Sequence, residues 1–149
     1  MKIGRADLYG PGEGERLTAR GSVMFFKAGS ETTKGRLSLM ERTLPSAGRM
    51  PPLHAHSDCE EAYYVLAGEV TFRLDGREVA GGPGCSVLVP SGVPHSFGNT
   101  SHQEARLLVI HAPALDAYFR ELQSLWSGQQ PPTLAAERKL MARHGMQPA

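Results

Sequence analysis

The chain has 149 residues, and its 16 lysines and arginines nearly balance its 15 aspartates and glutamates. This length suffices for one domain with a buried core. The charges are scattered without a basic block, which argues against a nucleic-acid partner. No apolar run is long enough to span a membrane or to serve as a secretory leader, so we expect a cytoplasmic protein. The only cysteines are Cys59 and Cys85, which argues against a disulfide framework.

Short apolar segments separated by seventeen glycines and eleven prolines predict an all-β domain. The first twenty residues are polar and rich in glycine, so we expect an N-terminal arm over residues 1–20. Candidate strands follow at Val23–Lys27, Arg36–Leu44, Tyr63–Leu66, Glu69–Leu74, Arg77–Ala80, Ser86–Val89, His95–Asn99 and Arg106–His111. Between two of them, the dipeptide Asp75-Gly76 predicts a two-residue hairpin turn.

The pattern becomes helical after Pro113. Six apolar residues follow helical spacing: Leu115, Tyr118, Phe119, Leu122, Leu125 and Trp126. Pro113 near the start and Gly128 just past the end are typical helix boundaries. A second helix is predicted from Thr133, as its N-cap, to about His144. The chain therefore ends in a helical tail over residues 113–149.

Four side chains have the chemistry and the spacing of a metal site. His54 and His56 lie two residues apart, so on a strand both side chains leave the same face. Glu61 follows five residues later, and His95 comes from a second segment. If the two segments pair in a sheet, three imidazoles and one carboxylate converge, which suits a divalent transition metal.

The histidines stand in two glycine-bounded motifs. The first runs from Gly48 through five residues to His54, skips one to His56, then four to Glu61 and six to Gly68. Tight turns are expected at the closing glycine, because glycine readily adopts the backbone conformations that such turns require.

The second motif runs from Gly84 through five residues to Pro90, skips one to Gly92, then two to His95 and three to Asn99. Both motifs are complete, and they resemble the two conserved motifs of the cupin superfamily. The chain is most similar to small single-domain bacterial cupins of the quercetinase-like kind. We expect Asn99 to fix a turn rather than to bind the metal.

The resemblance implies an all-β, double-stranded β-helix (jelly-roll) barrel over residues 21–112, followed by the helical tail. It also selects Glu61 over Glu60 as the acidic ligand, because the six-residue spacing to Gly68 fits only Glu61. The predicted metal ligands are thus His54, His56, Glu61 and His95. One divalent ion per chain is expected, with iron, manganese or nickel favoured and zinc or cobalt as alternatives.

Four further side chains are candidates for the pocket around the metal, although core packing is the simpler explanation for its aromatic members. Tyr63 lies two residues after Glu61, and Phe97 lies two residues after His95. Phe72 is a third aromatic candidate for the pocket. His111 alternates with apolar residues on the last strand, so it could point into the barrel.

Cupins perform many kinds of chemistry, so the resemblance leaves three functions open. The leading hypothesis is a metal-dependent dioxygenase that acts on a small organic substrate, with Glu61 as both ligand and catalytic base. The first alternative is a non-redox isomerase or cyclase, and the second is a cupin that binds a small ligand without catalysis. A homodimer is expected, because exposed sheet edges need covering.

Overall fold

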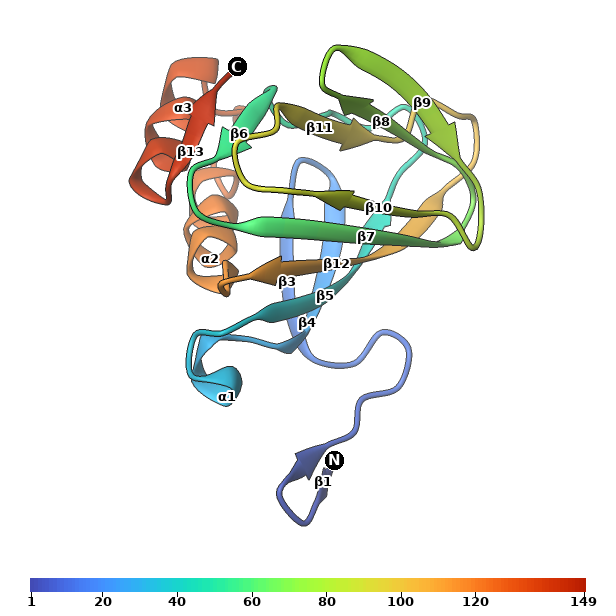
Figure 1. Cartoon of the computed structure of the whole chain (residues 1–149), viewed down its shortest axis with the longest axis vertical. Helices are drawn as coiled ribbons and strands as arrows, with labels where there is room; N and C mark the ends of the chain where they lie inside the picture. The colour runs from blue at the N-terminus through green and yellow to red at the C-terminus, as the bar shows by residue number, and fades with distance from the viewer.

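Two antiparallel β-sheets face each other and form a barrel in the computed structural model, which describes residues 1–149 (Figure 1). The six-stranded sheet contains, in spatial order, β10 (Ser86–Val89), β7 (Glu60–Ala67), β12 (Ala105–Ala112), β5 (Ser38–Leu44), β4 (Ser22–Ala28) and β3 (Glu15–Ala19). The five-stranded sheet contains β13 (Met146–Pro148), β6 (His54–His56), β11 (His95–Gly98), β8 (Val70–Leu74) and β9 (Arg77–Gly81). The predicted all-β jelly-roll barrel is confirmed.

The core lies between the two sheets, where alternate residues of each strand point inward. On β7, Tyr63 and Val65 are buried, and on β12 Leu107 and Val109 are completely buried. Burying one such aliphatic side chain contributes about 1.5–3 kcal/mol to the free energy of unfolding. This alternation fixes which side of each strand faces the barrel interior, and therefore which polar side chains can meet there.

The turn between β8 and β9 forms as its sequence predicts. Asp75 and Gly76 have φ angles of 47° and 81°. Two consecutive residues with positive φ make the turn that matches the twist of an antiparallel hairpin. Arg20 and Gly21 have φ angles of 53° and 75° between β3 and β4, so the same device turns the chain there.

The tail closes one end of the barrel. It contains α2 (Asp116–Leu125), α3 (Leu134–Arg143) and the strand β13, which pairs with β6. The predicted N-cap is present, since the Thr133 hydroxyl accepts a hydrogen bond from the backbone amide of Ala136. Figure 1 shows both helices beside the β6 end of the five-stranded sheet. None of the three helices combines the length and the hydrophobicity that crossing a lipid bilayer requires.

The N-terminal region differs from the expected arm. A hairpin of β1 (Lys2–Ile3) and β2 (Ala6–Asp7) extends away from the barrel, but β3 belongs to the six-stranded sheet (Figure 1). Only Leu17 and Ala19 of β3 are buried, so its sequence lacks a clear apolar alternation. A single helical turn, α1 (Ser30–Thr33), precedes β5 and was not predicted.

Candidate metal centre

The four predicted ligands come from three strands and meet inside the barrel. β6 carries His54 and His56 on its inward face, and β7 carries Glu61. β11 pairs with β6 so that His95 lies opposite His54. All four side chains are buried, and one nitrogen or oxygen from each lies within 4.8 Å of the others. The pairing of two segments distant in sequence thus builds a compact set of three imidazoles and one carboxylate.

Distances within the cluster fit a metal ion. Oε2 of Glu61 lies 2.9 Å from Nε2 of His56 and 2.9 Å from Nε2 of His95. Two atoms that bind one ion at about 2.1 Å, and at right angles to each other, lie about 3 Å apart. These two pairs of donor atoms therefore have the spacing of neighbouring ligands around a single ion, and all four donors lie within 4.8 Å of one another.

Backbone carbonyl groups orient two of the imidazoles. Nδ1 of His54 lies 2.7 Å from the Pro52 carbonyl oxygen, and Nδ1 of His95 lies 2.9 Å from that of Val93. A carbonyl only accepts hydrogen bonds, so each Nδ1 carries the proton and each Nε2 faces the cluster. Such a partner fixes the tautomer of a metal-binding histidine.

His111 holds the other oxygen of the carboxylate. It lies opposite Glu61 in the β12–β7 pairing, and its Nε2 is 3.0 Å from Oε1 of Glu61. The Nδ1 atoms of His111 and His56 are buried without a hydrogen-bond partner. Sequence alternation placed His111 toward the barrel, but its contact with Glu61 depends on the register between two strands.

The protonation states follow from burial and neighbouring groups. Burial alone would raise the pKa of Glu61, but electrostatic attraction to His111 and hydrogen bonds from His111, His56 and His95 hold that pKa well below its usual range. At His95, burial alone would lower the pKa, but the hydrogen bond to Glu61 raises it, so a metal that binds Nε2 displaces this proton. Burial, together with the proximity of His95, lowers the pKa of His54 to about 4. An ionised carboxylate and a neutral imidazole are the forms that bind a metal.

Comparison with known proteins identifies the family. Residues 40–111 match the cupin domain, a segment that includes all four donors. The chain is a small cupin. The matched segment contains both glycine-bounded motifs, and the family is the one that the sequence resemblance implied.

The relatives of this cupin perform different reactions. It is 28% identical over 117 residues to a quercetin 2,3-dioxygenase from Bacillus subtilis, a match that covers 78% of this chain but only 34% of that enzyme. A predicted oxalate decarboxylase from Thermotoga maritima is 27% identical, with a TM-score of 0.59 over 69% of this chain and 93% of the other. The polyketide cyclase RemF from Streptomyces resistomycificus is 26% identical, with a TM-score of 0.56 over 75% and 78% of the two chains. The chain thus spans about a third of the quercetin dioxygenase.

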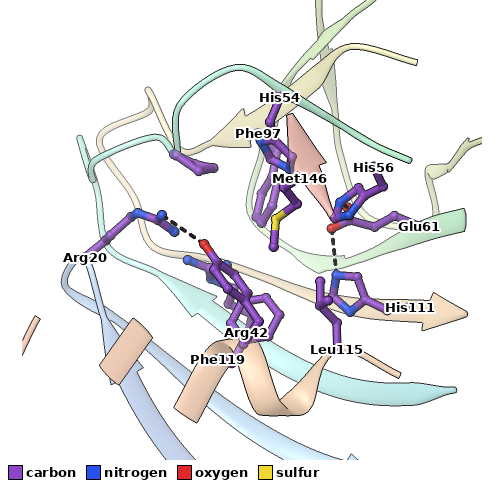
Figure 2. A pocket seen from close by; sticks show the side chains of 12 residues that line it. Arg20, Arg42, His54, His56, Glu61, Phe97, His111, Leu115, Phe119 and Met146 are labelled. Atoms are coloured by element: carbon purple, nitrogen blue, oxygen red, sulfur yellow. Dashed lines mark hydrogen bonds and ion pairs between the residues drawn. The ribbon is translucent and has the colours of Figure 1, made fainter. Parts of the chain in front are cut away.

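A narrow cavity of about 20 Å³ opens beside the cluster in this cupin (Figure 2). Its lining residues are Arg20, Arg42, Pro51, His54, His56, Glu61, Phe97, His111, Leu115, Tyr118, Phe119 and Met146. A volume of this size holds about one water molecule. Four of the lining residues belong to the tail, so the tail forms part of the cavity wall and a larger ligand requires that wall to shift.

Of the four predicted pocket residues, the structure places two on the cavity wall, namely Phe97 and His111. Tyr63 packs instead against Phe72 and Phe97, with ring centroids 5.3 and 4.9 Å apart, and neither Tyr63 nor Phe72 lines the cavity. Asn99 lies away from the cluster and fixes a turn, because its side-chain oxygen accepts hydrogen bonds from the amide and the hydroxyl of Ser101.

Sequence reasoning missed the two arginines and the methionine of the cavity wall. Arg42 lies on β5 and Arg20 in a hairpin turn, while Met146 pairs with His56 across β13 and β6. The only sequence signal was that Arg42 stands next to Glu41 in the middle of a predicted strand. Either of these two charged residues could have faced inward.

Proposed function

We propose that this cupin is a metal-dependent oxidoreductase of the dioxygenase type that acts on a small organic substrate. The observation that carries the proposal is the buried cluster of His54, His56, Glu61 and His95, whose donor atoms have the spacing of metal ligands. The likeness to the quercetin dioxygenase supports redox chemistry, although it covers only part of that enzyme. Iron, manganese or nickel is the favoured ion, and zinc or cobalt fits the same donors.

A bound divalent ion would supply open coordination positions where an oxygen donor of the substrate and dioxygen can be held together. The chain itself contributes a proton acceptor. Glu61 is ionised, and its Oε1 accepts a hydrogen bond from His111 while Oε2 faces the histidines of the cluster. Glu61 would help to hold the metal, and with Oε1 fixed by His111 its carboxylate would be placed to accept a proton from the substrate.

The test of this base role is the substitution Glu61→Gln. We expect turnover, followed as oxygen uptake, to fall at least 100-fold, in line with the effect of removing a general base. The amide keeps one oxygen donor, so metal content, measured by mass spectrometry, falls much less than turnover. Equal losses of turnover and metal would contradict a separate role for Glu61 as base.

A second candidate function is a non-redox isomerase or cyclase that uses the metal as a Lewis acid. The likeness to the polyketide cyclase RemF, which extends over 75% of this chain, favours it. Oxygen dependence separates the two candidates: a cyclase loaded with zinc turns over under argon, whereas a dioxygenase does not.

The expected homodimer remains a prediction. Tyr64, Leu88 and Ile110 are exposed on neighbouring strands of the six-stranded sheet, and the register places them on its outer face. β10 is also an edge strand of this sheet. An apolar face next to an open edge is a surface that a second copy would cover.

A further inference from the structure

Among the inward-facing residues of β5 there is one charged side chain, Arg42. Along β5 the inward positions are Ser38, Met40, Arg42 and Leu44, and all four are buried. Arg42 is only 2% exposed. A guanidinium in this position loses its hydration, and such a loss is costly unless another charged group compensates it.

No carboxylate forms an ion pair with Arg42, and Glu61 acts on it only from a distance. The Nε of Arg42 donates a hydrogen bond to the Ser22 hydroxyl at 3.0 Å, and its guanidinium carbon lies 5.1 Å from the centroid of the Phe97 ring. These contacts use one of its five N–H donors and bring no negative charge. Burial and the nearby charge of Arg20 lower the pKa of Arg42 to about 10, so the side chain remains charged at neutral pH.

The neighbouring Arg20, in contrast, forms an ion pair that balances its charge. Its Nε lies 2.8 Å from a carboxylate oxygen of Glu137, and its Nη2 is 3.4 Å from the Tyr118 hydroxyl. Glu137 also accepts a hydrogen bond from the Trp126 indole. Since Glu137 balances Arg20, the positive charge of Arg42 is in excess at this end of the cavity.

Arg42 and the metal ligands line the same cavity. Figure 2 shows Arg20 and Arg42 on one side of it, with His56, Glu61 and His111 on the other and Met146 between them. At the cluster, Glu61 offers one negative charge against the two positive charges of a divalent ion. With such an ion bound, both ends of the cavity have excess positive charge. A ligand with a negative group at each end complements this charge, and it enters when the tail residues of the cavity wall shift to make room.

We propose that Arg42 binds a carboxylate of the substrate, and that the substrate is a small organic dianion whose second oxygen-bearing group reaches the metal ligands. This inference rests on the proposed metal-dependent function, because it assigns the two ends of the ligand to the two ends of one cavity. The planar fork of a guanidinium suits a carboxylate, which it can bind through two parallel hydrogen bonds. Arg42 then determines specificity, since a neutral analogue leaves its charge buried and unpaired.

The experiment uses malonate and succinate as probes, with malonamide as the neutral analogue of malonate and acetate as the single carboxylate. Binding to the manganese-loaded protein is measured by titration calorimetry for the wild type, Arg42→Met and Arg42→Lys. Arg73→Met is the matched control, because it removes the same charge from an exposed position on β8, where Arg73 pairs with Glu78. Manganese content and thermal unfolding are recorded for every sample.

We expect one of the two dicarboxylates to bind at least tenfold more tightly than acetate or malonamide. Arg42→Met weakens that binding at least tenfold with the manganese content unchanged, Arg42→Lys weakens it less, and Arg73→Met has no effect. The inference is overturned if Arg42→Met binds the dicarboxylates as the wild type does, or if neither binds more tightly than acetate.

The manganese content tests the proposed function separately. If the wild type holds no manganese, the metal-dependent function fails, and the same titration on metal-free protein still decides the role of Arg42. If metal-free wild type binds a dicarboxylate and Arg42→Met does not, Arg42 is the carboxylate site. If Arg42→Met binds it equally well, that role of Arg42 is overturned.

Discussion

The two ends of the cavity are built in opposite ways. At the metal end, His54, His56 and Glu61 come from one stretch of chain, and backbone carbonyls orient the imidazoles. At the arginine end, Arg42 comes from β5 and Arg20 from the β3–β4 turn, and Glu137 of the tail completes the group. Two short motifs joined by one strand pairing specify the first end, whereas the second depends on packing between three separate segments.

This difference suggests that the two ends of the cavity have different roles, one in the reaction and one in the choice of substrate. The two glycine-bounded motifs contain all four donors of the metal end. The wall opposite these donors belongs to the N-terminal strands and the tail, and β13 of the tail also pairs with the ligand strand β6. We infer that the metal end provides reactivity and that the arginine end selects the substrate.

The sharpest test of the comparison substitutes methionine at each arginine in turn. Arg20→Met leaves the Glu137 carboxylate buried with only the Trp126 indole as a donor, so we expect a loss of about 3 kcal/mol in the free energy of unfolding. Arg42→Met breaks no ion pair and leaves this free energy within about 1 kcal/mol of the wild-type value. Denaturation in urea measures both, and equal losses would show that Arg42 is a structural residue.

The next effect concerns His111, whose side chain on β12 contacts Glu61 on β7. His111→Ala removes the hydrogen bond to Oε1 of Glu61, so the carboxylate loses its fixed orientation. We expect the metal affinity to fall about 10- to 100-fold, as is usual when the partner of a ligand is removed. A competition titration with a metal chelator measures this, with His102→Ala, in an exposed loop, as control. An unchanged affinity would mean that β7 alone positions Glu61.

The smallest expected effect is on the pH dependence of the free energy of unfolding, and it comes from Asp116, which attaches the tail to the barrel. Asp116 at the start of α2 accepts hydrogen bonds from the amide and the hydroxyl of Ser30, at 2.9 and 2.7 Å. Burial alone would raise its pKa, but these hydrogen bonds and the nearby Arg120 hold the pKa of Asp116 below its usual value. As the pH falls, the Asp116 carboxylate is therefore protonated in the unfolded chain at a higher pH than in the folded protein.

This stabilising contribution is complete above about pH 4, the ordinary pKa of an aspartate, and is lost as the pH falls further through the folded-state value. Asp116→Asn lacks this titration. We expect its unfolding free energy to depend less on pH below about pH 4 than that of the wild type. Parallel curves for the two proteins over this range would rule out Asp116 as the titrating group.

Much of the fold follows from the sequence. Apolar alternation located all eight predicted strands, and Asp75-Gly76 and Thr133 marked a turn and a helix start that the structure contains. The missed strands have little alternation: β1 and β2 have two residues each, β13 has three, and β3 buries just Leu17 and Ala19. Such strands form because a neighbouring strand is already in place, which sequence periodicity does not reveal.

The site was predictable where its residues are close in sequence. His54, His56, Glu61 and His95 could be named because two motifs contain them and one strand pairing joins the motifs. The contact between His111 and Glu61 depends on the exact register of β12 with β7. The position of Arg42 on the cavity wall depends on a third strand and on which of two adjacent charged residues, Glu41 or Arg42, faces inward. Only the structure shows this.

The central claim is that the histidine–glutamate cluster holds a divalent metal. The most direct measurement is the metal content, by mass spectrometry, of protein purified without a metal-affinity column, with His56→Ala as the comparison. We predict close to one iron, manganese or nickel ion per wild-type chain and less than a tenth of that in a folded His56→Ala variant. Well-folded wild-type protein that holds no metal, even after incubation with these ions, would contradict the claim.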